Sequence, residues 1–256
     1  CRGESIMKGI VSLSGGRDSS TLLAKVVKEL GAENVYAISF EYGSKHPAEL
    51  ECAKKIAEYY GIKEHKIISI DPSIFKGSTC TMLEGGAEVQ KDKSYDQIIE
   101  ENGEGAVDTY VPARNFLFSA YTCAYAESKA QETGDEITYY LGQHADDVAG
   151  QAYPDCGPDF VETMKNATEI SSSHKVHTES PFINWHKSDI IQLAIELGVP
   201  LNYTLSCYDP IKFEKDGKKY VKECGRCATC IDVQKALKAN GIEYKPTEIE
   251  IPVAVK

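Results

Sequence analysis

The residues from Leu13 to Ser20 read Leu-Ser-Gly-Gly-Arg-Asp-Ser-Ser and offer the groups that bind a phosphate. Two adjacent glycines let the backbone approach an anion closely. The amides of a following helical turn point at that anion, and the helix dipole favours its negative charge. No Gly-Lys-Ser/Thr follows, so the loop is not of the Walker type. We predict a nucleotide-phosphate cradle rather than an ordinary helix cap, formed by Leu13, Ser14, Gly15, Gly16, Asp18, Ser19 and Ser20.

Four cysteines near the C-terminus have the spacing of metal ligands. Cys224, Cys227 and Cys230 recur at intervals of three residues, which lets a tight turn aim their sulfurs at one point. Cys207 is the candidate fourth ligand, upstream of a polar, hairpin-like spacer over 212–222. Four thiolates with no open position favour structural zinc. The alternatives are an iron–sulfur site, a redox pair, or reduced cysteines around a helix start.

Apolar runs alternate with helical periods along most of the chain, which predicts a doubly wound parallel α/β sheet. In such sheets ligands bind beyond the carboxyl ends of the strands, where the loop at 14–19 lies. The helix over 114–132 is expected to have an inward face of Phe116, Leu117, Ala120, Cys123 and Ala124. The predicted strands cover 9–13, 35–40, 66–70, 138–141 and 176–182, and the predicted helices 22–30, 47–61, 114–132, 158–170 and 187–197.

Two stretches interrupt this alternation and set the expected domain organisation. Residues 84–108 are acidic and glycine-bearing with little periodicity, which predicts a mobile excursion, either a lid over the site or a solvated loop. The tail after Leu205 has too little apolar content to hold itself in place without the metal. We expect an extension or cloning remnant at 1–6, a nucleotide-binding α/β domain at 7–204 and a zinc element at 205–256.

Length and composition narrow the class of protein. A chain of 256 residues with 42% apolar residues suits one large domain, or one domain with an appendage. A net charge of −11 argues against a nucleic-acid partner, but not against ATP, whose phosphates need only local amides and a few cations. With no run of 18 apolar residues and no signal peptide, we expect no membrane contact. Nine cysteines then indicate thiols or metal in a cytoplasmic protein.

Several short motifs occur in one order along the chain. Ser-Gly-Gly-x-Asp-Ser at 14–19 resembles the PP-loop of the ATP pyrophosphatases, which split ATP into AMP and pyrophosphate. The motifs that follow are Tyr-Gly-Ser-Lys-His at 42–46, Val-Pro-Ala-Arg-Asn at 111–115, Tyr-Pro-Asp-Cys at 153–156, Lys-Ser-Asp-Ile at 187–190, Ser-Cys-Tyr at 206–208 and Cys-Gly-x-Cys-x-x-Cys at 224–230. Together they resemble the QueC family, the 7-cyano-7-deazaguanine synthases, from about Lys8 to Leu237.

The resemblance implies a Rossmann-like fold of the PP-loop (HUP) type and an ATP-dependent ligase that forms a homodimer. Such enzymes adenylate 7-carboxy-7-deazaguanine, so that AMP rather than hydroxide leaves when ammonia attacks. The amide is activated a second time and dehydrated to the nitrile, on the route to queuosine and archaeosine. ATP with Mg²⁺ would be the cosubstrate, and a single structural Zn²⁺ per chain the metal.

The resemblance also assigns roles in catalysis. Asp18 and Ser19 would lie around the pyrophosphate. Lys187, at a helix start, would bind phosphate as a point charge, the alternative being a solvated surface lysine. Arg114 would meet the substrate carboxylate or ATP in bidentate fashion, the alternative being a salt bridge at a helix N-terminus. The predicted catalytic residues are therefore Asp18, Ser19, Lys187 and Arg114.

The acceptor ring has an edge of N–H donors, for which a carboxylate is the natural partner. We expect Asp155 in the Tyr-Pro-Asp-Cys turn to accept these donors, with Tyr153 stacking or hydrogen-bonding nearby. Asp147 is the second acidic candidate for binding the acceptor. His144 could act as a base, but a single loop histidine is more often structural, so we leave it out of the catalytic set.

Some positions depart from the family pattern. Arg17 replaces a neutral residue, where it would assist a polyphosphate or point to solvent. Ala113 and Leu205 stand where glycine and tryptophan are common, and the spacer from 207 to 224 is long. These departures concern the acceptor more than ATP and keep other functions open. One is a related enzyme that stops at the amide or joins the deazaguanine to a protein or other amine; others are a tRNA-modifying PP-loop enzyme and a module without turnover.

Overall fold

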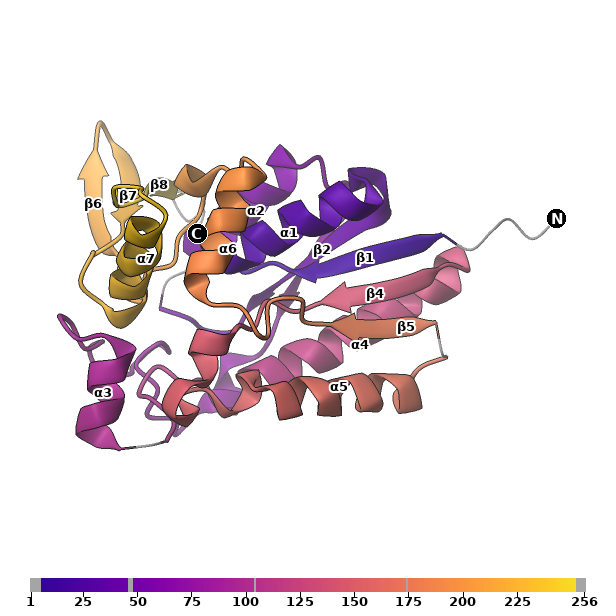
Figure 1. Ribbon diagram of the computed structural model, residues 1–256, viewed down its shortest axis with the longest axis horizontal. Coiled ribbons are helices and arrows are strands. Elements are labelled where there is room, and N and C mark those ends of the chain that lie inside the picture. Colours follow the sequence, from indigo (N-terminus) through magenta and orange to yellow (C-terminus); the bar gives the residue numbers. More distant parts are fainter. Residues whose placement is uncertain (1–5, 46–47, 104, 174, 252–256) are drawn as a thin grey trace.

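The computed structural model describes residues 6–45, 48–103, 105–173 and 175–251. A five-stranded parallel sheet forms its centre, with the strands in the order β3-β2-β1-β4-β5 (Figure 1). The chain builds outward from β1 through β2 and β3, then returns to the other side of β1 with β4 and β5. The strands are β1 (Met7–Ser12), β2 (Val35–Glu41), β3 (His65–Ser69), β4 (Glu136–Tyr140) and β5 (Val176–Glu179).

The strand order reverses between β1 and β4. Open parallel sheets with helices on both faces bind ligands beyond the carboxyl ends of the strands at such a reversal. Val11 of β1 lies opposite Ala37 of β2 on one side and Tyr140 of β4 on the other. Val11 and Ala37 are fully buried, as expected for central parallel strands between two layers of helices. The doubly wound parallel sheet predicted from the sequence is confirmed.

Helices cover both faces of this sheet. α1 and α6 pack together on one face, and α4 and α5 lie on the other (Figure 1). None of the described helices is long and apolar enough to cross a membrane. The predicted helix start at Pro47 and most of the extension predicted at 1–6 lie outside the described residues. The helices are α1 (Arg17–Leu30), α2 (Ala48–Tyr59), α3 (Tyr95–Asn102), α4 (Arg114–Thr133), α5 (Pro158–Ser171), α6 (Lys187–Glu196) and α7 (Ala228–Ala239).

The inward face predicted for α4 is confirmed only in part: Leu117 and Cys123 are partly buried and pack against the core, and the other three residues do not. Phe116 is 51% exposed, and Ala120 and Ala124 are exposed as well. Small side chains let α4 approach the sheet closely, and the hydroxyls among them donate to carbonyls one turn earlier, which permits their burial. The face that is buried instead consists of Ser119, Thr122, Ala126 and Ala130.

The excursion predicted at 84–108 contains a helix, α3. Its first turn is capped by Ser94, whose side chain accepts from the amide of Gln97, while the Gln97 side chain accepts from the amide of Ser94. Ile98 and Val107 are buried against Tyr153. The interpretation of this whole segment as an aperiodic loop is therefore wrong, because a capping box and two apolar anchors within it were overlooked.

The C-terminal segment forms a three-stranded antiparallel sheet and α7, and it packs on the α/β domain. The strands β6 (Ile211–Lys215) and β7 (Lys218–Lys222) make the predicted hairpin, and β8 (Glu248–Ile251) pairs with β7. Val221 and Ile249 are buried in one cluster with Leu205 and Cys207. Apolar contacts as well as the cysteines therefore hold this tail, and β8 was not predicted.

Arg17, the first residue of α1, reaches into the C-terminal segment. Its guanidinium donates to both carboxylate oxygens of Glu223, at 2.6 and 3.0 Å, and to Thr247 Oγ1 at 3.2 Å. Both charged side chains are at most 3% exposed. Glu223 also accepts from the amides of Ser206 and Thr247 and from the Tyr244 hydroxyl. Both roles predicted for Arg17, beside a polyphosphate or in solvent, are wrong.

Removing one partner of this buried pair should destabilise the fold strongly. We expect Arg17→Met to lower the free energy of unfolding by about 3–5 kcal/mol, because the Glu223 carboxylate is left buried without a counter-charge. The double variant R17M/E223Q should regain part of that loss, since no charge then stays buried. Urea denaturation measures both changes.

The control for this experiment is the surface pair between Lys25 and Glu29 on α1. Glu29→Ala should cost less than about 1 kcal/mol. Equal losses for R17M and E29A would contradict the role given to the buried pair.

Candidate active site

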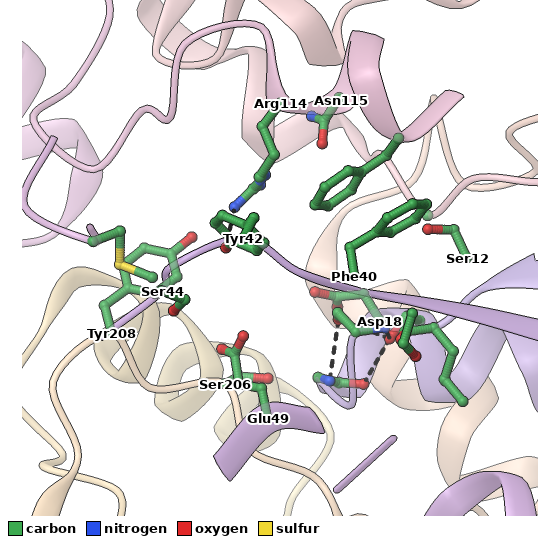
Figure 2. Close-up of a pocket in the computed structure, with 18 of the residues that line it drawn as sticks. Ser12, Asp18, Phe40, Tyr42, Ser44, Glu49, Arg114, Asn115, Ser206 and Tyr208 are labelled. Atoms are coloured by element: carbon green, nitrogen blue, oxygen red, sulfur yellow. Dashed lines mark hydrogen bonds between the residues drawn. The ribbon is translucent and has the colours of Figure 1, made fainter. Parts of the chain in front are cut away.

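A cavity of about 600 Å³ opens at the carboxyl ends of β1, β2 and β4 (Figure 2). The residues that line it include parts of the phosphate loop, the segment after β2, the starts of α2 and α4, the segment after β4, and the chain around Cys207. Of the sequence-predicted site residues, Leu13, Ser14, Gly16, Asp18, Ser19, Arg114, Asp147, Tyr153 and Lys187 line the cavity. Gly15, Ser20 and Asp155 are not among its lining residues.

The phosphate loop is held tightly against α2. Gly15 has φ +89°, and a Cβ there would lie 2.1 Å from the carbonyl oxygen of Glu49 and 2.7 Å from the amide of Ala53. Only glycine fits this position. The hydroxyl of Ser19 accepts from the amide of Ser14 at 3.1 Å and lies 3.0 Å from the Ser14 hydroxyl. The loop therefore has its shape before any ligand binds.

One carboxylate and two cationic groups meet beside this loop. Lys187 Nζ donates to Asp18 Oδ2 at 3.0 Å, and His144 Nε2 lies 3.6 Å from the same oxygen. Burial alone would raise the pKa of Asp18, but Lys187 and His144 outweigh it and hold that pKa well below its usual range. Burial likewise opposes the charge on Lys187, yet Asp18 and Asp147 raise its pKa above the usual value. Lys187 is therefore a charged, partly buried group aimed at the phosphate loop, not a solvated lysine.

The opposite half of the cavity is aromatic and contains Arg114. Arg114 Nη1 donates to the Tyr42 hydroxyl at 3.3 Å, and the guanidinium carbon lies 5.8 Å from the centre of the Phe118 ring. Among the described residues Arg114 makes no ion pair, and its buried Nε has no hydrogen-bond partner. The predicted alternative of a salt-bridged arginine at the start of α4 is therefore not what the structure contains. Arg114 keeps donors available to a ligand.

Tyr153 lies at the centre of a hydroxyl network on one wall of this half. Its hydroxyl is 2.7 Å from Thr109 Oγ1, 2.9 Å from the Tyr95 hydroxyl and 3.4 Å from that of Tyr208. Tyr95 comes from α3 and also lies 3.1 Å from Thr229 Oγ1. The network thus joins α3 and the C-terminal segment to the wall of the cavity.

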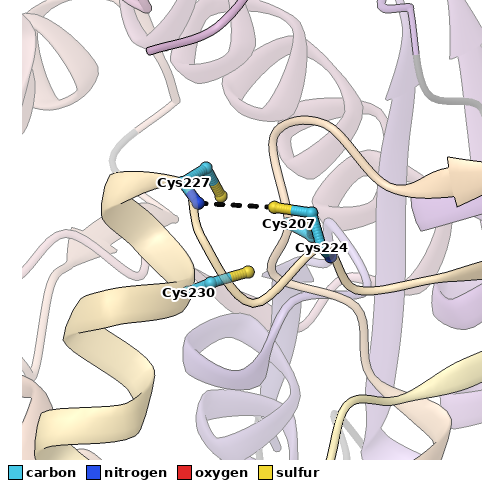
Figure 3. Close-up of side chains that lie close together, drawn as sticks. All are labelled: Cys207, Cys224, Cys227 and Cys230. Atoms are coloured by element: carbon cyan, nitrogen blue, oxygen red, sulfur yellow. Dashed lines mark hydrogen bonds between the residues drawn. The ribbon is translucent and has the colours of Figure 1, made fainter. Parts of the chain in front are cut away.

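The four cysteines predicted as metal ligands lie together (Figure 3). The sulfurs of Cys207, Cys224, Cys227 and Cys230 are all within 4.8 Å of one another. Amides of the turn donate to these sulfurs, from Cys224 to Cys207 and from Cys227 to Cys224, each at 3.3 Å. Sulfurs bound to one tetrahedral ion at ~2.3 Å would be roughly 3.8 Å apart, so the cluster fits such an ion with a small contraction. The residues can hold a metal.

Comparison with known proteins agrees with these features. A family model described as Queuosine biosynthesis protein QueC matches residues 8–241. The chain belongs to the QueC family. A 7-cyano-7-deazaguanine synthase of Rhodopirellula baltica is 36% identical over 241 residues, which cover 92% of this chain and 89% of that protein. The enzyme of the same name from Acaryochloris marina is 38% identical over 229 residues, which cover 88% and 91%. As a QueC-family member the chain is an ATP-using carbon–nitrogen ligase.

His144 is one of the residues of this QueC-family site that sequence reasoning left out of the catalytic set. It is 3% exposed and lines the cavity, and its Nε2 lies 3.6 Å from carboxylate oxygens of both Asp18 and Asp147. Burial lowers its pKa, but Asp147 and Asp18 outweigh that and raise it. The available signal was its place directly after β4, a strand end that meets β1 only in the folded sheet.

Asp155 occupies a different place from the one expected. It is buried, and its carboxylate accepts from the amide of Asn115 at 2.9 Å and from the Asn115 side chain at 3.3 Å. These bonds satisfy donors in the first turn of α4. Since its oxygens are already used, the structure gives Asp155 a role in positioning α4, and its predicted contact with the acceptor has no support from this geometry.

The Asp155→Asn variant separates these two roles. We expect the free energy of unfolding to fall by ~1 kcal/mol, because the new amide turns a donor toward the donors of Asn115. Thermal unfolding measures this, and Asp159→Asn at the exposed start of α5 is the control, expected within ~0.5 kcal/mol of the parent chain. Lost acceptor binding at unchanged stability would instead support the predicted contact.

Proposed function

We propose that this QueC-family ligase is a 7-cyano-7-deazaguanine synthase, which converts 7-carboxy-7-deazaguanine, ammonia and ATP to the nitrile. The observation that carries the proposal is one cavity with two different ends. The phosphate loop with Asp18 and Lys187 forms one end, and the aromatic half with Arg114 forms the other. A single cavity of this kind suits the transfer of a nucleotide group to a planar acid. The names of the relatives supply the acceptor.

The chemistry requires activation because a carboxylate is a poor electrophile. In the first step a carboxylate oxygen attacks the α-phosphorus of ATP and pyrophosphate leaves. Ammonia then attacks the acyl carbon, loses a proton, and AMP leaves, which gives the amide. The amide oxygen then attacks the α-phosphorus of a second ATP and pyrophosphate leaves. Loss of two protons from nitrogen and departure of AMP with that oxygen complete the nitrile. Arg114 would orient the acid through the donors it keeps available.

The residues of the phosphate end suit the leaving pyrophosphate. The amides after Gly16 and the hydroxyls of Ser14 and Ser19 would bind its oxygens, and Lys187 would offset its charge. Asp18 would hold the Mg²⁺ that accompanies ATP, since carboxylate oxygens are preferred Mg²⁺ ligands and its buried Oδ1 has no hydrogen-bond partner among the described residues. Mg²⁺ would offset negative charge on the phosphates, and Lys187 would offset it from a fixed position beside the loop.

Mass spectrometry of a reaction mixture tests the proposed function. We expect the purified protein with 7-carboxy-7-deazaguanine, Mg-ATP and ammonium to yield the nitrile, AMP and pyrophosphate. Lys187→Gln should lower AMP formation by at least about 100-fold, a loss of roughly 2.7 kcal/mol of transition-state stabilisation.

Other products would redirect the proposal. AMP with amide alone, or with mass added to a protein amine, indicates the related enzyme that stops early or conjugates the deazaguanine. No AMP from the parent chain would contradict the proposed function.

We further propose that the four-cysteine cluster binds Zn²⁺ as a structural ion. Four sulfurs leave no coordination position for a substrate, and thiolates are ligands that zinc prefers. The cluster lies beside the apolar contacts that attach the C-terminal segment, so the ion would fix β7 and α7 relative to each other. The same thiols, with small-molecule substrates, are consistent with a cytoplasmic enzyme, which we expect to be a homodimer.

Metal analysis tests the zinc proposal. We expect one zinc ion per chain in the purified protein and less than half of that in Cys207→Ser, with a loss of several kcal/mol in the free energy of unfolding. Cys123→Ser, at a cysteine of α4 outside the cluster, is the matched control and should keep its metal. Iron in place of zinc would favour the iron–sulfur alternative. No metal, with C207S as stable as the parent chain, would contradict the site.

A further inference from the structure

We propose that Glu49, in the first turn of α2, is the residue that selects a guanine-type ring, by accepting hydrogen bonds from its ring N–H and exocyclic amino group. The inference rests on the proposed function for its ligand, but its geometry is independent of the chemical steps. Asp155 was expected to do this from the sequence, and its oxygens are occupied by Asn115. A carboxylate that faces the cavity without such partners is better placed to meet the acceptor.

Glu49 is the carboxylate of the cavity wall that is still available. Asp18 is bonded to Lys187, and Asp146 accepts from both the backbone amide of Lys187 and the ring of His186. The remaining acids of the wall are bonded or exposed: Asp147 accepts from the amide of His144, Glu41 from Ser69, Asp232 lies 3.8 Å from Lys235, and Glu84 is exposed. No described residue donates a hydrogen bond to the Glu49 carboxylate, which points into the cavity (Figure 2).

The charge on Glu49 is poorly balanced while the cavity is empty. Burial raises its pKa to about 7, and among the described residues the guanidinium of Arg114 is the charge that opposes this rise. A ligand with two adjacent N–H donors would stabilise the carboxylate, and a charge-assisted pair of this kind is stronger than neutral hydrogen bonds. The empty site therefore favours a ligand that supplies donors at this point.

Arg114 faces Glu49 across the cavity and supplies the complementary group (Figure 2). A guanine-type edge presents two donors followed by an oxo acceptor. The carboxylate of Glu49 fits the donors, and the guanidinium of Arg114, which among the described residues donates only to the Tyr42 hydroxyl, fits the oxygen. A ring without the exocyclic amino group would leave one carboxylate oxygen unmet.

Aromatic side chains border the space between these two residues. Tyr42 and Phe118 pack edge to face with ring centres 5.5 Å apart. Tyr208 also lines the cavity (Figure 2). Such walls accept a planar heterocycle by stacking. Planar shape would be recognised by these rings, and the hydrogen-bonding pattern by Glu49.

The position of Glu49 relative to the phosphate loop is rigid. The missing Cβ of Gly15 allows the Glu49 backbone to lie against the loop, since a Cβ there would be 2.1 Å from its carbonyl oxygen. Glu49, which would bind the ring, therefore lies at a fixed distance from the phosphate loop, which would bind pyrophosphate. This contact places the acceptor within reach of ATP.

Binding of two ring analogues tests the inference. The probes are 7-carboxy-7-deazaguanine and the corresponding deazahypoxanthine, which lacks the exocyclic amino group, titrated by calorimetry into the parent chain and Glu49→Gln. We expect the parent to prefer the deazaguanine at least about tenfold, and E49Q to lose ~10–100-fold in affinity for it with a preference near one. ATP affinity should stay within about twofold.

Glu51→Gln is the matched control, because Glu51 lies in the same turn of α2 but pairs with Lys54 on the surface. It makes the same change in charge and should leave both affinities unchanged. If E49Q does not fold by circular dichroism, Glu49→Asp replaces it; this variant keeps both oxygens and should retain the preference at lower affinity.

The outcomes separate this inference from the proposed function. Two results would overturn the role of Glu49 alone, in each case with a parent chain that prefers the deazaguanine. In the first, E49Q keeps the full affinity and the preference. In the second, where E49D is used, that variant loses the preference. Preference that depends on Glu49, without AMP or nitrile in the turnover experiment, supports this inference and contradicts the proposed function. A parent chain that binds neither ring overturns both.

Discussion

The buried ion pair between Arg17 and Glu223 is the constraint on which the rest of the site depends. Arg17 follows the phosphate loop directly, and Glu223 precedes the first cysteine of the turn at 224–230. A charge buried without its partner is very costly, so this pair favours a docking of the two segments in which both charges are matched. Two further bonds reinforce that docking: the amide of Arg17 donates to Ser206 Oγ at 3.1 Å, and the amide of Leu205 donates to the carbonyl of Gly15 at 3.0 Å.

This docking makes the cavity a joint product of the α/β domain and the C-terminal segment. The first supplies the phosphate loop, Glu49 and Arg114, while the second supplies Ser206 and Tyr208. The cysteine cluster stands just behind the second group and does not itself line the cavity. A structural metal there would act on the reaction only by holding these side chains where the acceptor binds.

The two ends of the cavity are built on different physical principles. Around Asp18 the charges are already balanced by Lys187 and His144, so a phosphate and its cation would, on the proposed function, exchange partners with groups that are in place. In the aromatic half, the Glu49 carboxyl has a pKa raised to about 7 by burial and accepts no hydrogen bond from a described residue, and the Arg114 guanidinium donates only to Tyr42 among those residues. The segment that forms α3 reaches this second end through Tyr95, whose hydroxyl lies 2.9 Å from that of Tyr153 and 3.1 Å from Thr229 Oγ1.

The sequence by itself determined the sheet class, the phosphate loop and the four-cysteine cluster, because each depends on residues close together in the chain or on a regular period. The start of α4 was predictable for the same reason, but its buried face was not, since small side chains let it pack closer than its apolar residues would. Only the tertiary structure decided the partner of Arg17, which lies 206 residues away, and the bonding of Asp155 to Asn115. Those outcomes depend on which donors fold next to each oxygen, and no local pattern of residues carries that information.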